Sequence, residues 1–177
     1  MAGGKVALVT GASRGAGRGI AVGFGELGYT VYVTGRTTTP GAAKGWDGTV
    51  LPGTVAETAA QVTAAGGKGI PVLCDHADDA QTAHVFEQIA RDQGGLDILF
   101  NNAAYRHDDL IEKKRFWEKS LDNMRLLDVG LRSAYVASWH AARMMVHAGK
   151  GLIAFGSSFG ASCYMHGPCY GAQKAGI

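Results

Sequence analysis

The stretch KVALVTGASRGAG, residues 5–17, decides the fold. Residues 5–10 are an apolar run rich in valine, which predicts a short buried strand. Three glycines follow at turn positions: Gly11, Gly15 and Gly17. Residues 15–28 then carry apolar side chains at helical spacing. A strand, a glycine-rich turn and a helix in this order are typical of a phosphate-binding turn in a parallel α/β sheet.

Strands and helices alternate through the rest of the chain. We expect strands at residues 30–34, 69–74, 96–100 and 151–156, and helices at residues 55–65, 78–93 and 120–147, the last with a break near Gly130. Residues 37–52 are rich in glycine, proline and threonine and are expected to form a surface loop. The alternation predicts one domain of the α/β class, residues 1–177, with a Rossmann-like doubly wound parallel sheet.

Composition and charge exclude several classes of protein. Seventeen basic and fifteen acidic side chains give a formal charge of +2 without any basic block, so nucleic acid is not expected as a partner. No apolar stretch reaches the roughly eighteen residues that cross a bilayer. Cys74, Cys163 and Cys169 are odd in number and form no Cys-x-x-Cys pair, so we expect no metal site and a reducing compartment such as the cytoplasm.

The end of the chain is unusual for this class of fold. A helix is expected from Pro168, and it has made only about two or three turns when the sequence ends at Ile177. The final residues are still compatible with a helix. We therefore expect an incomplete domain that lacks the C-terminal part of the fold.

The residues after the second expected strand bear on the choice of cofactor. An NAD site of this type carries an acidic residue about twenty residues beyond the glycines, because a carboxylate binds the ribose 2′-hydroxyl. Here the strand ends Thr34-Gly35-Arg36, without an acid. Arg36 and Arg14 would instead bind a 2′-phosphate by charge-assisted hydrogen bonds, which favours NADP (NADPH) over NAD. The alternative is that both arginines are simply solvated surface residues.

Three polar residues near the end of the chain indicate catalysis. Tyr170 and Lys174 are four residues apart on the expected helix, so their side chains share one face. A neighbouring ammonium stabilises a phenolate, which suits a tyrosine to act as a general acid. Ser157 lies thirteen residues before Tyr170, at the mouth of the last expected strand.

A hydrolase is the rival interpretation of this region. Residues 156–160 read Gly-Ser-Ser-Phe-Gly, which matches the Gly-x-Ser-x-Gly turn of α/β-hydrolases and also follows a strand. That triad needs an acid and then a histidine after the serine. No Asp or Glu follows Ser158, so this interpretation is rejected.

Together these motifs resemble the short-chain dehydrogenase/reductases, in the branch with a TGxxxGxG turn and a Ser, Tyr and Lys triad. Residues 101–104, Asn-Asn-Ala-Ala, are similar to the family's Asn-Asn-Ala-Gly element, and Asp75 stands where the family places an aspartate beside the adenine. The resemblance covers essentially the whole chain. Within the family it is closest to the dehydrogenase/reductase member 1 subgroup, on residues 116–118, 129–132 and 142–153.

The resemblance implies an NADPH-dependent oxidoreductase that reduces a small-molecule carbonyl to an alcohol, or catalyses the reverse. Its implied catalytic residues are Ser157, Tyr170 and Lys174. The implied cofactor-binding residues are Gly11, Ser13, Arg14, Gly15, Gly17, Arg36, Asp75, Asn101, Ala103, Tyr170 and Lys174. The alternative is a catalytically impaired nucleotide-binding fragment or an interaction protein on the same fold.

Two further expectations concern the long helix at residues 120–147. Its apolar side chains Tyr135, Trp139, Met144 and Met145 are expected to pack in the core, because apolar residues at this spacing usually face the sheet. The resemblance implies that this helix and the Tyr170 helix form a homo-oligomer interface in the complete protein. Asp128 stands where the family commonly has an asparagine, and a carboxylate cannot donate a hydrogen bond as an amide does.

Overall fold

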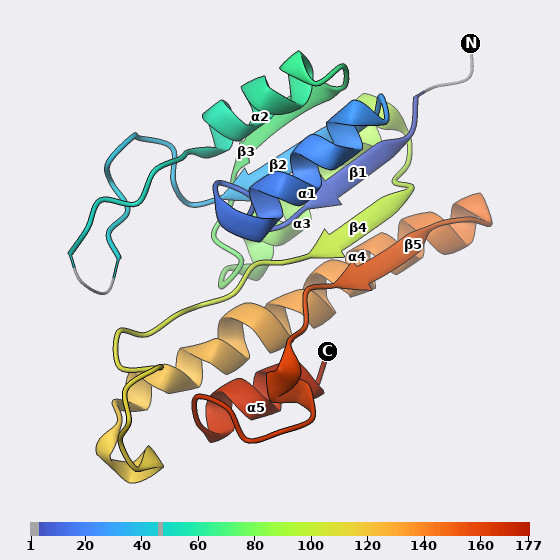
Figure 1. Cartoon of the computed structure of the whole chain (residues 1–177). Helices are drawn as coiled ribbons and strands as arrows, with labels where there is room; N and C mark the ends of the chain where they lie inside the picture. The colour runs from blue at the N-terminus through green and yellow to red at the C-terminus, as the bar shows by residue number, and fades with distance from the viewer. Residues whose placement is uncertain (1–3, 46–47) are drawn as a thin grey trace.

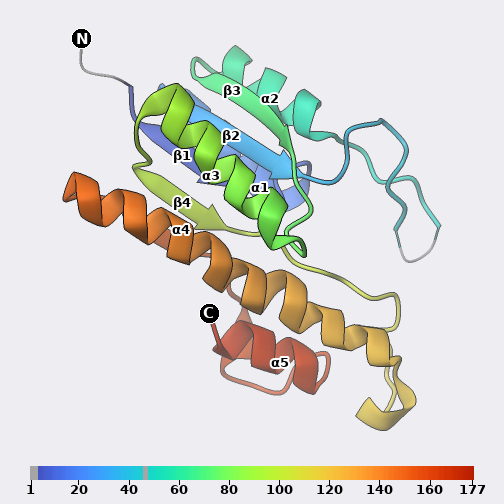
Figure 2. The ribbon, with the colours of Figure 1, turned by 180° about the vertical axis from the view of Figure 1, so that it is seen from behind.

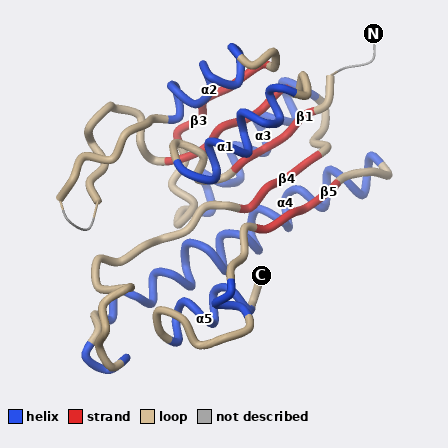
Figure 3. The backbone as a smooth tube through the Cα atoms, viewed as in Figure 1, coloured by secondary structure: helices blue, strands red, loops and turns tan. Residues whose placement is uncertain are grey.

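The computed structural model describes residues 4–45 and 48–177, and its centre is one parallel sheet. Five strands pair in the order β3-β2-β1-β4-β5, and every pairing is parallel. Their bounds are β1 Val6–Val9, β2 Thr30–Gly35, β3 Lys68–Leu73, β4 Ile98–Asn101 and β5 Leu152–Phe155. The strands therefore all end at the same edge of the sheet, from which the loops toward α5 extend (Figures 1 and 3).

Helices cover both faces of the sheet. Helices α1 (Gly15–Glu26) and α2 (Val55–Ala64) lie on one face, and α3 (Asp79–Gln93) and α4 (Ser133–Ala148) lie on the other, as the two opposite views show (Figures 1 and 2). Helix α5 (Pro168–Ala175) lies beyond the carboxyl end of β5. Four short segments complete the chain: η1 Phe116–Glu118, η2 Leu121–Met124, η3 Leu127–Arg132 and η4 Phe159–Ala161. The prediction of a Rossmann-like α/β sheet is confirmed.

The central strand β1 is continuously apolar because both of its faces are buried. Val6 and Leu8 pack into the core on the α3 and α4 face, whereas Ala7 and Val9 pack into the core on the α1 and α2 face. Each of the four is at most 4% exposed. Successive side chains of a strand point to opposite faces, so a strand covered on both sides has no polar alternation.

Helix α3 begins where the sequence predicts. Asp78 is its N-cap, and its carboxylate accepts hydrogen bonds from the backbone N–H groups of Ala80 and Gln81. These bonds satisfy donors that have no partner inside the helix. An acidic cap also opposes the positive end of the helix dipole.

The expected helix at residues 120–147 is wrong in its first half. The regular helix α4 begins only at Ser133, after η2 and the distorted segment η3. Val129 and Gly130 leave helical geometry, and the φ of +139° at Gly130 is one that side-chain-bearing residues rarely adopt. The freed carbonyl of Val129 accepts a hydrogen bond from the N–H of Tyr105. The expected break near Gly130 is therefore confirmed.

The prediction that four apolar side chains of this helix pack in the core is correct for two of them. Met145 is buried and Met144 packs against the core, whereas Tyr135 is 72% exposed and Trp139 is 48% exposed. Small residues carry the buried face of α4 in their place, namely Ala134, Ala137 and Ala141. Trp139 is covered instead by the guanidinium of Arg143, 4.6 Å from its ring centroid.

The long loop after β2 is confirmed for the residues that the structure describes. Lys44 and Val50 form one isolated antiparallel bridge across it, and residues 46–47 of the expected loop lie outside the described residues. Within the described ranges, no helix has the length and apolar character needed to span a bilayer.

Candidate functional site

A cavity of about 290 Å³ opens at the carboxyl ends of β1, β2 and β4. Its wall combines the glycine-rich turn, the end of β2, the loop after β3 and the loop after β4. The residues lining it are Gly11, Ser13, Arg14, Gly35, Arg36, Thr37, Cys74, Asp75, His76, Asn102, Ala103, Ala104 and Val129. Most of the predicted cofactor-binding residues therefore meet in one place. We refer to it as the nucleotide cavity.

The three glycines of the turn are required for two different reasons: lack of space at Gly11 and Gly17, and a positive φ at Gly15. A Cβ on Gly11 would lie 2.7 Å from the Cα of Ala103, and a Cβ on Gly17 would overlap the side chain of Asn102. Gly15 has a φ of +57° and open space above it. Helix α1 begins at Gly15 with no side-chain cap and no acidic residue in its first turn. Its first N–H groups are therefore available to an anion at this point.

Thr10 and Asn102 hold the turn against the loop after β4. The Thr10 hydroxyl oxygen accepts hydrogen bonds from the N–H groups of Asn102 and Ala103, both at 2.9 Å. The Asn102 amide donates to the carbonyl oxygens of Thr10 and Gly11, also at 2.9 Å. These four bonds fix the floor of the nucleotide cavity.

The two neighbouring asparagines have different positions. Asn101 is buried, and its amide donates to the hydroxyl of Ser138 on α4 at 3.0 Å, so it lies beneath the cavity rather than in its wall. Asn102 lines the cavity. Sequence reasoning named Asn101 and Ala103 and missed Asn102. The sequence could have indicated this, because adjacent residues at the end of a strand point to opposite sides of the sheet, so Asn101 and Asn102 cannot both face the cavity.

The two arginines predicted to bind a phosphate differ in their contacts. The Arg14 guanidinium donates to the hydroxyl of Thr37 and to the carbonyl oxygens of Pro52 and Gly53, so it braces the loop after β2. Burial and the neighbouring charges of Arg18 and Arg36 lower the pKa of Arg14. Arg36 is exposed at the rim. An anion beside Arg14 and Arg36 would relieve their mutual repulsion.

The loop after β3 contributes Asp75 and His76. The Asp75 carboxylate accepts a hydrogen bond from the N–H of Ala77 and lines the nucleotide cavity. His76 is only 5% exposed, and its Nε2 lies 2.8 Å from the hydroxyl oxygen of Thr34 on β2. Burial lowers the pKa of His76 to about 4, so the ring is neutral at pH 7. His76 thus links β2 to the loop after β3, a role that its sequence position did not reveal.

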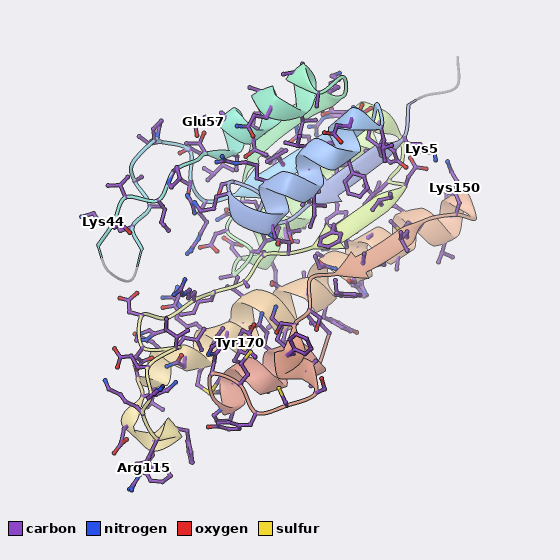
Figure 4. All side chains as sticks on the ribbon, in the orientation of Figure 1. Lys5, Lys44, Glu57, Arg115, Lys150 and Tyr170 are labelled. Carbon is purple, nitrogen blue, oxygen red and sulfur yellow. The ribbon has the colours of Figure 1, made fainter. Side chains whose placement is uncertain are left out.

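A second cavity, of about 390 Å³, contains the predicted catalytic pair. Tyr170 and Lys174 line it from α5, together with Ala104, Tyr105, Arg106, Leu110, Ile111, His166 and Gln173. Ala104 lines this cavity and also the nucleotide cavity. A ligand that crosses Ala104 would therefore extend from the glycine turn to Tyr170. We refer to this space as the reaction cavity; Figure 4 labels Tyr170 on α5.

The two serines before α5 make different contacts. Ser158 Oγ lies 2.9 Å from the hydroxyl oxygen of Tyr170, whereas Ser157 Oγ donates to the backbone oxygen of Lys174 at 3.3 Å. Both serines are exposed. The structure thus brings the hydroxyl of Ser158, which was not predicted for this set, to the Tyr170 phenol, whereas the hydroxyl of Ser157 contacts only the backbone of Lys174.

Lys174 is held close to the tyrosine. Its Nζ lies 5.7 Å from the centroid of the Tyr170 ring and donates to the carbonyl oxygen of Gly156 at 2.9 Å. Burial lowers the pKa of Lys174. The side chain of Asp128, by contrast, is exposed at the kink before α4, and it makes no hydrogen bond to Lys174 among the residues that the structure describes.

Asp109 organises the loop on the far side of the reaction cavity. Its carboxylate accepts hydrogen bonds from the N–H of Ser120 and the amide of Asn123, and it contacts the ring of His107, all at 2.7 Å. Burial tends to raise the pKa of Asp109, but these three contacts outweigh it and hold the pKa at about 2. A largely apolar cavity of about 400 Å³ lies between this loop and α5.

A glycine turn beneath an uncapped helix, with a tyrosine and a lysine across the same sheet edge, defines a nucleotide-binding protein of the Rossmann type. The chain belongs to the short chain dehydrogenase family, whose model matches residues 5–177. Membership of this family suggests an NAD(P)-dependent oxidoreductase. The family predicted from the sequence motifs is therefore confirmed.

Individual relatives agree with this assignment. "Dehydrogenase/reductase SDR family member 1" of Mus musculus is 40% identical over 97% of this chain. A crystal structure of a putative short-chain alcohol dehydrogenase from Sinorhizobium meliloti superposes with a TM-score of 0.77 at 31% identity, over 98% of this chain and 62% of that one. A metagenomic short-chain oxidoreductase in complex with NADP gives a TM-score of 0.78 at 27% identity, over 98% of this chain and 72% of that one. The chain spans 52% of the length of the mouse relative.

Proposed function

We propose that the protein reduces a carbonyl compound to an alcohol with NADPH, or catalyses the reverse reaction. The observation that carries this proposal is the placement of Tyr170 and Lys174 in a cavity that shares Ala104 with the nucleotide cavity. A proton donor and the candidate nucleotide site thus lie on two sides of the same residue, Ala104. Bound NADPH supplies a hydride, and the protein supplies position and electrostatics.

The described residues fit this cofactor. Gly11 and Gly17 have no room for a Cβ, because Ala103 and Asn102 pack directly against them, so the turn is held tightly against the loop after β4 at the edge of the nucleotide cavity. The proposed cofactor-binding residues are Gly11, Ser13, Arg14, Gly15, Gly17, Arg36, Asp75, Asn102, Ala103, Tyr170 and Lys174. Asn101, which was expected in this set, lies beneath the cavity and would support its floor from there. Arg36 would bind the 2′-phosphate, and the first N–H groups of α1 would bind the pyrophosphate. NADP is favoured over NAD because β2 ends without an acidic residue.

Tyr170 acts as the general acid in this proposal, because the residue lines the reaction cavity and a cation lies beside its ring. The hydroxyl gives its proton to the substrate oxygen as the carbonyl becomes an alkoxide. Lys174 favours the phenolate that remains, and the ribose hydroxyls of the cofactor would take the place of its contact with Gly156.

Ser157 holds the carbonyl oxygen in this proposal. Its bond to the Lys174 carbonyl is long and exposed, so it is given up easily when a substrate oxygen arrives. Ser158 already engages Tyr170 at 2.9 Å, and it would orient the phenol before the substrate binds.

Association and location complete the proposal. The exposed aromatic side chains Tyr135 and Trp139 on α4 support a homo-oligomer of the complete protein. Cys74, Cys163 and Cys169 are free thiols, which is consistent with a reducing compartment such as the cytoplasm.

A nucleotide-binding protein without turnover is the second candidate. It is favoured by the exposed position of Asp128, which leaves Lys174 without a side-chain partner from η3 among the described residues. The two candidates differ in one observable. Both bind NADPH, but only the first consumes it when a carbonyl is added.

The test is a screen of ketones and aldehydes with the full-length protein. NADPH consumption is followed by absorbance, and NADPH and NADH binding by fluorescence. We expect NADPH-dependent reduction of at least one carbonyl. Tight NADPH binding with no consumption for any compound would favour the second candidate.

A further inference from the structure

A cavity lined by four cationic side chains lies beside the two cavities described above. Its volume is about 420 Å³, and Arg14, Arg36, Lys44 and Arg106 all line it. Asp108 is the single acidic residue among the described residues in its wall. Counted over the part of the chain that the structure describes, four positive charges against one carboxylate favour an anion in this cavity.

The proposed cofactor accounts for only two of these four charges. Arg14 and Arg36 also line the nucleotide cavity, where the 2′-phosphate would lie, whereas Lys44 and Arg106 do not. Lys44 lies on the loop that projects from the sheet after β2 (Figure 4). Lys44 and Arg106 are therefore two charges that the proposed cofactor does not use.

Arg106 connects this cationic cavity to the reaction cavity. It lines both, together with Ala104 and Tyr105, and the reaction cavity also contains Tyr170. None of the described residues that line the reaction cavity is acidic. Its two cations, Arg106 and Lys174, therefore face no carboxylate there.

Two acidic residues follow Arg106 closely in the chain, and neither forms an ion pair with it. Asp108 is exposed and lines the cationic cavity together with Arg106. Asp109 is buried, and its oxygens are engaged by Ser120, Asn123 and His107. Arg106 itself is exposed and forms no ion pair within residues 4–45 and 48–177. Its guanidinium is thus free to bind a carboxylate or phosphate in a bidentate way.

We infer that Arg106, supported by Lys44, is a specificity-determining residue that selects carbonyl substrates carrying a carboxylate or phosphate group. This inference rests on the proposed carbonyl reduction. The reacting carbonyl lies at Tyr170, the body of the substrate packs against Leu110 and Ile111, and its anionic group reaches Arg106. A cavity of about 390 Å³ accommodates a small aromatic or aliphatic compound of this kind.

Matched aldehydes test this assignment in the full-length protein. The anionic probes are 4-carboxybenzaldehyde and 4-formylphenyl phosphate, and the neutral probe is methyl 4-formylbenzoate. We measure KM and kcat for each in the wild type, in Arg106→Leu and in Arg106→Lys. Arg115→Leu is the control, because Arg115 has the same charge and a nearby position in the chain, but it packs 5.4 Å from the Trp117 ring and lines none of the three cavities.

We expect Arg106→Leu to raise KM for the carboxylate probe about tenfold, as the loss of a charge-assisted pair implies, and to leave the neutral ester within about twofold. Arg106→Lys should retain more affinity for the phosphate probe than for the carboxylate probe. Lysine binds as a point charge without the two-point geometry of arginine, and the phosphate carries more negative charge than the carboxylate. Arg115→Leu should change neither the KM of the anionic probes nor that of the neutral ester.

Two results would overturn the inference while the proposed function stands. One is reduction of all three probes with KM values that Arg106→Leu leaves unchanged. The other is a rise in the Kd of NADPH in Arg106→Leu that is as large as the rise in KM for the carboxylate probe. That result would mean that Arg106 binds the cofactor. NADPH binding without reduction of any probe or other carbonyl would remove the proposed function, and with it this inference.

Discussion

Ser158, and not Ser157, hydrogen-bonds the hydroxyl of Tyr170: the two oxygens are 2.9 Å apart. Ser157 donates instead to the backbone oxygen of Lys174, one helical turn along α5. The two serines are adjacent in the chain but contact different parts of the same helix. Their roles in the reaction can therefore be separated by mutation.

Removing the hydroxyls of Ser157 and Ser158 one at a time should lower kcat by different factors. We expect Ser157→Ala to lower kcat by about 100-fold, because it removes a donor to the developing alkoxide. Ser158→Ala should lower kcat by only about tenfold, because Tyr170 keeps its proton and loses only a partner that orients it. Steady-state kinetics with one carbonyl measures both, and the reverse order of losses would assign the carbonyl-binding role to Ser158.

The choice between NADP and NAD depends on Arg36. Arg36→Ala should raise the Kd of NADPH by about 10- to 100-fold, since charge-assisted hydrogen bonds are worth about 1.5–3 kcal/mol. The Kd of NADH should change by less than about twofold, because NADH has no 2′-phosphate. Fluorescence titration gives both constants. An equal loss for the two cofactors would mean that Arg36 supports the fold of the rim and not the phosphate.

Stability should depend on pH through His76. The native pKa is about 4 and the unfolded value about 6.5, so between these pH values the unfolded chain binds a proton that the native protein does not. The free energy of unfolding should therefore fall as the pH falls through this window, by about 3 kcal/mol in total, and this component should not change further below pH 4.

Denaturant unfolding of His76→Asn and of the wild type between pH 7 and pH 4 measures this effect. The variant should be less stable at pH 7, since it loses the contact with Thr34, and the difference should shrink or reverse near pH 4. His84→Gln is the matched control, because the His84 side chain is 67% exposed. A difference between His76→Asn and wild type that stays constant with pH would contradict the assignment.

The loop beside the reaction cavity should depend on Asp109. Asp109→Ala leaves the N–H of Ser120 and the amide of Asn123 without their acceptor, and it should cost about 2–3 kcal/mol of stability. Amide exchange should rise in residues 110–124 more than in the sheet. Asp122→Ala is the control, because the Asp122 side chain is 68% exposed. Unchanged exchange in residues 110–124 would show that the loop is held by other contacts.

Local signals in the sequence predicted much of the fold. The apolar run of β1, the Asp78 cap and the break at Gly130 each follow from chemistry within a few residues. The start of α4 was mispredicted, because the Val129 carbonyl leaves the helix to bond Tyr105, a residue far away in the chain. A propensity pattern contains no information about such a partner.

The candidate site was predicted less completely than the fold. Spacing alone brought Tyr170 and Lys174 onto one face, because a helix fixes that relation. The contacts of Ser158, Asn102 and His76 depend on how loops from different strands meet, and a loop conformation is not encoded in a periodic pattern. Arg14 lines the nucleotide cavity, and its bonds to the loop after β2 could not be predicted from the sequence pattern.

The most direct test of the account is Tyr170→Phe in the full-length protein. The change removes one hydroxyl and keeps the ring that lies beside Lys174. We predict that the Kd of NADPH stays within about twofold and that carbonyl reduction falls at least about 100-fold, as expected for the loss of a general acid. Carbonyl reduction that continues at the wild-type rate in Tyr170→Phe would contradict the account.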